Sequence, residues 1–336
     1  MFFKKEGYLV SDIGGTKTTI ALVDAKTSQI ILEKTHLNHD IKHYTDTLVH
    51  FLNLPEAQHY KVKRACIAIA GPINADRTQA KLSNYDWKID AANILVRTSI
   101  HHVTIINDFE AIGLGVNTLK TEDYVELTNF GRNTSGAIAV IGAGTGLGVS
   151  ILPHSTGDRI PMQSEGGHVD MPIDIKSTID IKFQSFLRQK KLYQDVEDVV
   201  SGRGILNIYK FLLTQKIKHN PKIKFAISKM QDNEKPAFIT KYALEDKDAL
   251  CIKTLELFIK YYSRVARNLA LTTMSTEIIL SGGIAPKIVS ALQDVFVEEF
   301  VQHDRENMTR ILERVTILVI TDDNIAIKGC INALRL

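Results

Sequence analysis

The stretch GYLVSDIGGTKTTIALVD, residues 7–24, combines a carboxylate with a glycine turn between two apolar runs. Asp12 stands at the end of the first run, just before Gly14 and Gly15. The P-loop spacing G-x-x-x-x-G-K-[ST] is not met, because no glycine lies five residues before Gly15. The run 18–23 is apolar and β-branched, so it predicts a second strand. Such a strand–turn–strand unit offers backbone N–H groups to an anion, although an ordinary hairpin without a ligand fits this stretch equally well.

A second stretch, AIAVIGAGTGLGVSIL, residues 137–152, repeats this order of apolar run, glycine turn and apolar run. Its glycines alternate, at Gly142, Gly144, Gly146 and Gly148, whereas a dinucleotide fingerprint needs G-x-G-x-x-G leading into a helix. The dinucleotide interpretation therefore fails at both turns. Two similar hairpins predict two similar domains facing a cleft that can hold a polyphosphate.

A polar pair, Asn107 and Asp108, follows the β-branched run 103–106. An acid and an amide at the carboxyl end of a buried strand stand where α/β folds place ligand contacts. The alternative is a cap on the next helix, which Asn and Asp also favour.

Three further stretches carry polar groups beside glycines. In SEGGHVD, Glu165 and His168 can hydrogen-bond the hydroxyls of a ligand, and the spacing does not form the zinc motif H-E-x-x-H. In VEDVVSGRG, Glu197 is a ligand candidate or a surface carboxylate. In LSGGIAPK, Gly282 and Gly283 end a strand before a helix, which suits a nucleotide's base or ribose or is merely a tight turn.

Hydrophobic patterning predicts mixed strands and helices along the whole chain, hence an α/β or α+β class. The strands are expected at 7–13, 18–23, 64–70, 103–106, 137–141, 147–152 and 277–280. One long helix is expected at 248–271 with Asp248 as its cap, and another from Pro286 to Val301. The basic segment 216–236 predicts a solvated loop followed by a short helix, with a polyanion-binding patch as the alternative.

Composition is that of an ordinary soluble protein. The 336 residues suit about two domains, with 44% apolar and 24% charged residues. A net charge of +3 argues against a nucleic-acid partner. The three cysteines form no metal or disulfide spacing, which suits a cytoplasmic location. No signal peptide and no apolar run of about 20 residues is seen, so no membrane partner is expected.

Taken in order, these motifs resemble those of the bacterial glucokinases of the hexokinase/actin-like ATPase superfamily. The resemblance runs from DIGGTK through INDF, IGAGTGLG, EGGHVD, VEDVVSG and LSGGIAPK to the tail DDNIAIKGCINAL. It implies a two-domain actin-like ATPase (ribonuclease H-like) α/β fold with an interdomain cleft for ATP and sugar. The small domain would comprise residues 1–108 and 322–336, the large one residues 109–321, and each would have a five-stranded sheet.

The resemblance also implies a role for each motif residue in the transfer of phosphate from ATP to the 6-hydroxyl of glucose. Asp108 would be the catalytic base, and Asp12 would hold Mg²⁺, through water. The other sugar ligands would be Asn84, in a stretch that ends at Trp87, together with Asn107, Glu165, His168 and Glu197. The nucleotide contacts would be Gly14, Gly15, Thr16, Lys17, Gly142, Gly144, Thr145, Gly146, Gly282 and Gly283. A homodimer is a further expectation from the family.

One residue departs from the glucokinase pattern. Lys17 replaces a common asparagine and is more typical of the ROK sugar kinases, which include kinases for acylated amino sugars. The ROK branch carries a cysteine-rich zinc motif after its Gly-His, however, and GGHVDMPIDIKSTIDIKFQSF contains no cysteine.

Two other classes are alternatives. A sugar-sensing repressor would need a DNA-binding domain before Asp12, where only 11 residues stand. A regulator without catalytic activity is conceivable, although Asp108 is intact. A nicotinamide dehydrogenase is disfavoured by the glycine spacing.

Overall fold

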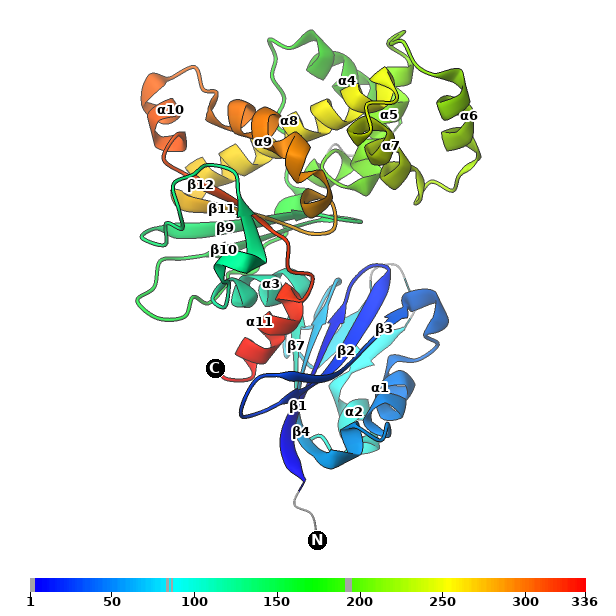
Figure 1. The fold of residues 1–336 in the computed structure, drawn as a ribbon, viewed down its shortest axis with the longest axis vertical. Helices are drawn as coiled ribbons and strands as arrows, with labels where there is room; N and C mark the ends of the chain where they lie inside the picture. Colours follow the sequence, from blue (N-terminus) through cyan, green and yellow to red (C-terminus); the bar gives the residue numbers. More distant parts are fainter. Residues whose placement is uncertain (1–3, 83–84, 86, 191–194) are drawn as a thin grey trace. The chain divides into compact units, whose positions relative to one another are not determined.

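The computed structural model describes residues 4–82, 85, 87–190 and 195–336. The chain forms two compact units (Figure 1), each described here by itself. The first comprises Met1–Lys120, Gly157–Gln163 and Asp322–Leu336, and the second comprises Thr121–Thr156 and Ser164–Thr321. The domain division expected from the sequence, at Asp108 and at residue 322, stays a prediction, and the compact units change at Lys120 and at Asp322.

The elements of the first unit are as follows. They are β1 (Lys5–Ile13), β2 (Lys17–Asp24), β3 (Ile30–Leu37), α1 (Tyr44–Leu52), β4 (Tyr60–Ile69), β5 (Gln79–Lys81), β6 (Lys88–Asp90), α2 (Ala91–Arg97), β7 (His102–Asn107), α3 (Asp108–Val116) and α11 (Ile325–Ala333). The main sheet has the order β3-β2-β1-β4-β7, and β5 pairs with β6 in a separate ribbon.

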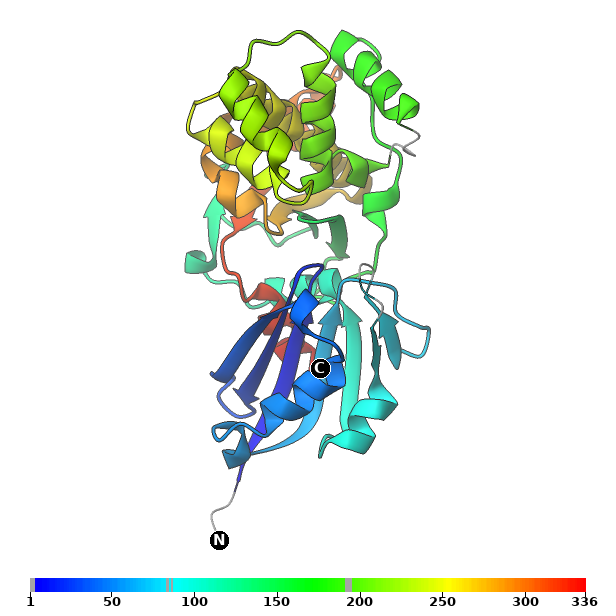
Figure 2. The same ribbon diagram turned by 90° about the vertical axis from the view of Figure 1, so that its right-hand side faces the viewer.

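The strand directions bring three carboxyl ends to one edge of this sheet. β1 is antiparallel to β2 but parallel to β4, and β4 is parallel to β7. Helices α1 and α2 lie on one face of the sheet, and α3 and α11 lie on the other (Figures 1 and 2). Polar residues at the ends of β1 and β7 therefore gather at the same edge.

Successive side chains of β1 point to opposite faces of the sheet, so this strand contributes to the packing on both faces. Leu9 and Ile13 belong to the buried cluster that also contains Tyr44 and Leu48 of α1. On the other face, the Sγ of Cys330 from α11 lies 3.7 Å from a β1 carbonyl oxygen. The strand is therefore covered on both sides, as its nearly continuous apolar sequence requires.

Helix α3 belongs to the first unit because it packs directly on α11. A Cβ atom on Gly329 would lie 1.7 Å from the carbonyl oxygen of Ala111, so only glycine allows this approach of the two backbones. Just after α3, the side chain of Asn117 donates to the carbonyl of Arg159 and accepts from its N–H, at 2.9 and 3.1 Å. These contacts explain why residues 109–120 and 157–163 join the first unit.

The second unit contains the remaining elements. They are β8 (Tyr124–Glu126), β9 (Ala137–Ala143), β10 (Leu147–Leu152), α4 (Thr178–Gln189), α5 (Gly202–Leu213), α6 (Pro221–Lys229), α7 (Lys235–Leu244), α8 (Ala249–Thr273), β11 (Ser275–Ser281), α9 (Val289–Val301), α10 (Glu306–Leu312) and β12 (Thr316–Ile320). Its sheet has the order β10-β9-β11-β12-β8. Both five-stranded sheets are as expected from the sequence.

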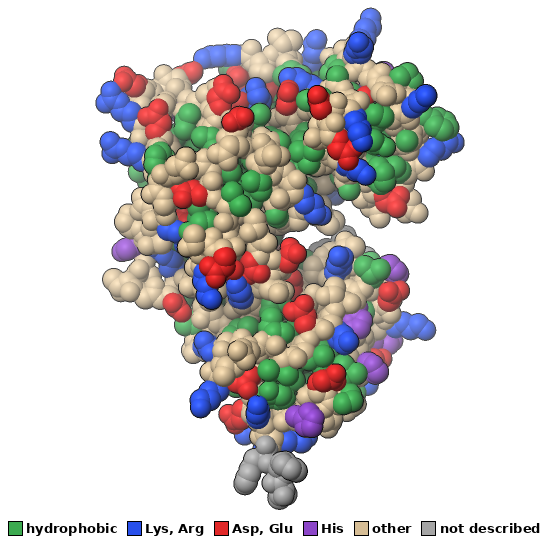
Figure 3. All heavy atoms as spheres, viewed as in Figure 1, with side chains coloured by type: hydrophobic (Ala, Val, Ile, Leu, Met, Phe, Trp, Pro, Cys, Tyr) green, Lys and Arg blue, Asp and Glu red, His purple; other side chains and the backbone are tan. Residues whose placement is uncertain are grey.

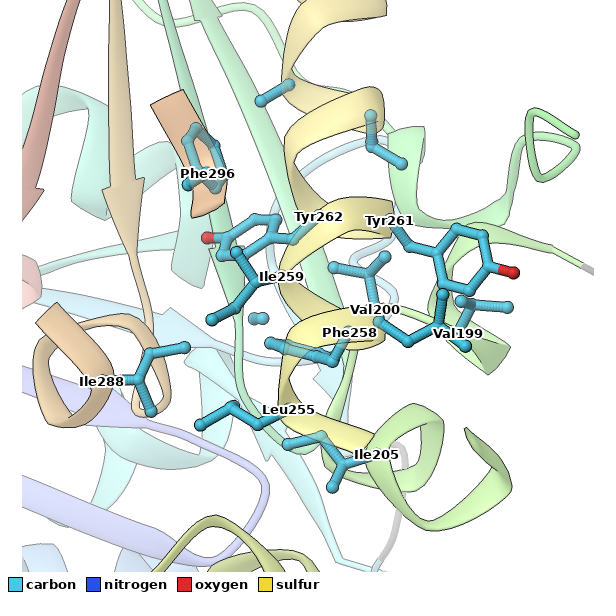
Figure 4. Close-up of a cluster of buried hydrophobic side chains, with 14 of the residues drawn as sticks. Val199, Val200, Ile205, Leu255, Phe258, Ile259, Tyr261, Tyr262, Ile288 and Phe296 are labelled. Atoms are coloured by element: carbon cyan, nitrogen blue, oxygen red, sulfur yellow. The ribbon is translucent and has the colours of Figure 1, made fainter. Parts of the chain in front are cut away.

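The long helix α8 forms the centre of the second core. Asp248 caps it as predicted, accepting from the N–H of Cys251 at 2.9 Å. Phe258 and Tyr262 are buried between β9 and the neighbouring helices (Figure 4). The hydroxyl of Tyr262 donates to the carbonyl of Ile141 at 2.9 Å, which anchors β9 shortly before its glycine turn.

Two proline positions differ in detail from the prediction. Pro286 lies in a short 3₁₀ turn, Ala285–Ile288, and α9 itself begins at Val289. Pro221 does not break a loop but begins α6, with the side chain of Asn220 accepting from the N–H of Lys222. Proline suits a first helical turn because its missing N–H has no partner there, so the basic segment starts a helix earlier than expected.

Charged side chains of both signs intermingle on the face shown in Figure 3, in keeping with the near-balanced net charge. Among the described residues, no helix is both long and apolar enough to cross a membrane.

Candidate functional site

The first glycine turn joins β1 to β2 and is closed by a hydrogen bond from the N–H of Gly14 to the carbonyl of Lys17, 3.0 Å long. Thr16 and Lys17 are exposed at its tip. Asp12 lies two residues before the turn and is partly buried. Burial raises the pKa of its carboxyl to about 6, because the charged form loses hydration.

Asn38, which follows β3, is bonded to this turn by its side chain and its backbone. Its Nδ2 donates to the carbonyl of Gly14, and its Oδ1 accepts from the hydroxyl of Thr18, both at 2.8 Å. Its backbone N–H donates to the carbonyl of Thr16 at 2.9 Å. Sequence analysis did not single out Asn38, because its contact depends on the pairing of β3 with β2.

Asn107 and Asp108 stand at the junction of β7 and α3, as the sequence indicated. The Oδ1 of Asn107 accepts from the N–H groups of Phe109 and Glu110 at 2.8 and 3.3 Å. The helix-cap alternative is therefore correct for Asn107, whose Nδ2 still leaves a donor for a ligand. Asp108 is the first residue of α3 and is partly exposed.

Strand register relates Asp12 to Asp108. Asp12 is paired with Ala68 of β4, and Ala68 is paired with Ile106 of β7. Two strand spacings of about 4.8 Å put Asp12 roughly 10 Å from Ile106 along the sheet. Asp108 follows two residues later, so both carboxylates occur at one edge of the sheet, beside the glycine turn.

The second glycine turn joins β9 to β10, and the N–H of Gly144 donates to the carbonyl of Gly146 at 2.8 Å. Thr145 is exposed at the tip, like Thr16 in the first turn. The predicted nucleotide residues after β11 contact this turn. Gly282 has φ +82°, and a Cβ there would lie 2.6 Å from the carbonyl oxygen of Ala143, which also accepts from the N–H of Ile284 at 3.1 Å.

Glu197 is directed toward this second turn. Its Oε2 accepts from the backbone N–H of Leu147 at 3.0 Å, and its Oε1 accepts from the guanidinium of Arg203 at 2.8 Å. A Cβ on Gly146 would meet Oε2 at 2.5 Å, so a side chain there would displace the Glu197 carboxylate from the turn. The sugar role predicted for Glu197 stays a prediction, and the observed contacts add a structural role at the second glycine turn.

Glu165 and His168 lie beside the same turn, on a 3₁₀ segment, Gly166–His168, and the residue before it. A Cβ on Gly167 would lie 2.1 Å from the carbonyl oxygen of Leu147, so the segment packs closely on the start of β10. The Nδ1 of His168 is 2.8 Å from Oδ2 of Asp195. That hydrogen bond raises the pKa of His168 because it favours the protonated ring.

The second unit thus brings together Glu165, His168, Glu197, the second glycine turn and the Gly282–Gly283 turn. The first unit brings together Asp12, the first glycine turn, Asn107 and Asp108. Asn84 lies outside the described residues. Trp87 is mostly buried and stacks on Tyr44 with ring centroids 6.2 Å apart, so its observed role is packing.

Sequence reasoning missed the residues that hold the motif residues in place, namely Asn38, Asp195 and Arg203. Asn38 and Asp195 are ordinary polar residues outside any glycine motif, Arg203 lies between two glycines, and only the fold brings each to its partner. The one available signal was the VEDVVSGRG stretch, which contains Arg203 and directly follows Asp195.

Groups of three or more His, Cys, Asp or Glu side chains suited to a metal are absent from the described part of the chain. The edge beside Asp12 nonetheless fits Mg²⁺ bound with a nucleotide. Mg²⁺ uses one or two carboxylates with phosphate oxygens and water, and Asp12 is a partly buried carboxylate beside an anion-binding turn.

Two α/β units, each with a five-stranded sheet and a glycine turn between two antiparallel strands, define the class as the actin-like ATPase fold. The model of the family described as glucokinase matches residues 9–336. A curated glucokinase of Nostoc punctiforme is 34% identical over 340 residues, covering 96% of each chain.

Solved structures agree. The crystal structure of a glucokinase from an Antarctic psychrotroph has a TM-score of 0.78 and 28% identity, covering 98% of this chain and 99% of that one. A ROK family glucokinase from Streptomyces griseus, solved with glucose and AMPPNP, has a TM-score of 0.64 and 16% identity over 97% of each chain, which shows the fold alone. The chain belongs to the glucokinase family.

Proposed function

We propose that this chain transfers the γ-phosphoryl group of ATP to the 6-hydroxyl of D-glucose. The observation that carries the proposal is the shared sheet edge of the first unit. There the register brings Asp12, the first glycine turn and Asp108 together. A phosphate site and a carboxylate for a hydroxyl are what this reaction requires.

Asp108 would align the sugar hydroxyl and accept its proton. Phosphoryl transfer passes through a loose transition state, so catalysis is mostly positioning and charge stabilisation. An aspartate with an ordinary pKa of about 3.9 is a weak base for an alcohol. We therefore assign Asp108 mainly to alignment, with proton transfer late.

Asp12 would hold Mg²⁺ with the terminal phosphates, which would offset the cost of a carboxylate in a position that burial makes unfavourable. When bound, the ion supplies positive charge against the phosphate oxygens. The N–H groups of the first turn, including those of Gly15 and Thr16, would donate to the same oxygens.

The second unit would bind the rest of both substrates. Thr145 and the turn around it would contact the phosphates, and Gly282 with Gly283 would line the adenosine. Glu165 and His168 would hydrogen-bond sugar hydroxyls. A site that pairs each hydroxyl rejects an analogue that lacks one, because a buried polar group is then left unpaired.

The test is a coupled assay of Mg²⁺- and ATP-dependent phosphorylation of glucose, mannose, fructose, N-acetylglucosamine and N-acetylmannosamine. We expect a clear preference for glucose. Preference for an acylated amino sugar would keep the chemistry but favour the ROK-like specificity that Lys17 suggests. No turnover with any of these sugars would contradict the proposal.

Three further expectations are part of this proposal: cytoplasmic location, a role in glycolysis and a homodimer. The balanced composition and the absence of a cysteine framework support the first. Light scattering on the purified protein tests the last, since a homodimer would have twice the 37.6 kDa of one chain.

A further inference from the structure

Asn38 is a fully buried polar residue whose bonds all serve the first glycine turn and the chain beside it. It donates from Nδ2 to Gly14 and from its backbone N–H to Thr16, and its Oδ1 accepts from Thr18. Its own carbonyl accepts from the N–H of Ile41 at 3.1 Å. An amide that is both donor and acceptor is needed here, because its two partners are a carbonyl and a hydroxyl.

Because the peptide bond is planar, these hydrogen bonds also fix the directions of the N–H groups in the first glycine turn. In a trans peptide, the carbonyl of one residue and the N–H of the next point in opposite directions. The Gly14 carbonyl points to Asn38, so the N–H of Gly15 points away from it. The Thr16 carbonyl also points to Asn38, so the N–H of Lys17 points away as well.

We infer that Asn38 is a positioning residue for phosphate binding, which aims the N–H groups of Gly15 and Lys17 at the nucleotide by holding the carbonyls of Gly14 and Thr16. This rests on the proposed function, in which the turn binds the terminal phosphates of ATP. Preorganised N–H donors stabilise developing charge without reorganising during the reaction. Loss of the hydrogen bonds from Asn38 would let each of these two peptides rotate and present its carbonyl to the phosphate.

The neutral amide also matters electrostatically. An aspartate at this position would still accept from the Thr18 hydroxyl, but its second oxygen would face the Gly14 carbonyl. It would also place a negative charge behind a turn that binds an anion. Asn38→Asp is therefore nearly isosteric, yet it opposes the inferred role in both respects.

The experiment measures the affinity of the full-length protein for AMPPNP with Mg²⁺, and separately for glucose, by isothermal titration calorimetry. For Asn38→Asp we expect the dissociation constant for AMPPNP to rise at least ~10-fold, the consequence of one mispaired buried polar group. We expect the constant for glucose to stay within about twofold of the wild-type value, since the observed hydrogen bonds of Asn38 are to the turn, Thr18 and Ile41.

Thr18 supplies a milder pair of variants in case Asn38→Asp does not fold. Thr18→Val keeps the shape but removes the hydroxyl that orients Asn38, and we expect weaker AMPPNP binding. Thr18→Ser keeps the hydroxyl and should restore the wild-type affinity. A residue with a merely structural role would not give this pattern.

Asn332 provides a matched control in the same unit. Its Nδ2 donates to the carbonyl of Leu114 at 3.2 Å, so Asn332→Asp disturbs a comparable buried amide away from the turn. Its AMPPNP affinity should be unchanged. Folded Asn38→Asp and Thr18→Val proteins with wild-type AMPPNP affinity would overturn the inference alone. Wild-type protein that fails to bind AMPPNP would overturn the proposed function, and the inference with it.

Discussion

The two glycine turns have similar outlines but are held by different chemistry. The first is held by the neutral, fully buried amide of Asn38. The second is held by the carboxylate of Glu197, which is paired with Arg203. The first turn is thus bonded to Asn38, which has no predicted ligand role. The second turn is bonded to Glu197, which is itself a predicted sugar ligand.

The residues that surround the two glycine turns also have different predicted roles. Asp12 and Asp108 stand beside the first turn, where the chemistry is proposed to occur. Beside the second turn stand Glu165, His168 and the Gly282 turn, which are predicted to bind. Substitution of the two carboxylates beside the first turn should therefore act mainly on turnover, and substitutions near the second turn should act mainly on affinity.

The largest effect is expected for Asp108→Asn. This change removes the carboxylate that aligns the hydroxyl and should lower kcat at least ~100-fold, the lower end for loss of a general base. Steady-state kinetics at saturating glucose and ATP measure it. Asp90→Asn, at the cap of α2 in the same unit, is the matched control and should leave kcat unchanged. Near-normal turnover of Asp108→Asn would remove this residue from the mechanism.

Asp12→Asn should stabilise the protein while impairing its activity. The folded-state pKa of about 6 lies above the ordinary 3.8, so ionised Asp12 costs up to about 3 kcal/mol of stability at pH 8. The penalty falls as the pH drops through 6 and disappears only below 3.8, where both states are protonated. Urea unfolding without divalent cations should show the variant to be more stable at pH 8 and nearly equal to wild type at about pH 3. Equal stability at both pH values would contradict the shift.

Glu197→Gln tests whether the second turn is coupled to sugar binding. The change weakens the charge-assisted bonds to Leu147 and Arg203, worth about 1.5–3 kcal/mol each. We expect the KM values for glucose and ATP to rise together, each by about tenfold. A rise in the KM for glucose alone would show that the second glycine turn is not coupled to sugar binding.

Glu165→Gln is the complementary test, with a smaller effect. Glu165 is exposed. Among the described residues, no observed hydrogen bond joins its side chain to the second glycine turn. We therefore expect the KM for glucose to rise more than the KM for ATP. Equal changes in both constants would count against a specific sugar role.

The smallest effect is expected for Asp195→Asn, which probes the His168 pair. Because Asp195 raises the pKa of His168, the pair stabilises the fold below the ordinary value near 6.5 and loses this contribution as the pH rises through the raised value. Half of the His168 side chain is exposed, so we expect a Tm difference on the order of 1–2 °C at pH 5.5 that vanishes at pH 9. A Tm difference that does not vary with pH would contradict the stabilising role of the His168–Asp195 hydrogen bond.

Much of the fold could be predicted because local pattern and tertiary structure agree. The apolar runs around both glycine turns form β1, β2, β9 and β10 as expected, and Asp248 caps α8. The start of α9 was predicted three residues early, because proline fits a 3₁₀ turn as readily as a helix. The domain boundary expected after Asp108 stays a prediction, and the packing of Gly329 on Ala111, which places α3 in the first compact unit, involves residues far apart in the chain.

The site was predictable only where a residue belongs to a recognisable motif. Asp12, Asp108, Glu165 and His168 stand in such motifs. Asn38 could not be found, because its role depends on which residue of β2 lies opposite the end of β3. Arg203 and Asp195 likewise acquire their partners through folding. The sequence therefore pointed to candidate ligand contacts, which stay predictions, but not to the residues that hold the glycine turns and His168 in place.

The position of α11 has a consequence for how this protein forms during synthesis. This helix packs against α3 and β1 of the first unit, yet the ribosome makes it only after the whole of the second unit. Because α3 covers only part of that face, the nascent first sheet must wait with the rest of one apolar face uncovered, while the second unit can complete its core earlier. Chaperone binding to nascent chains should accordingly concentrate on β1 and β4 until α11 emerges.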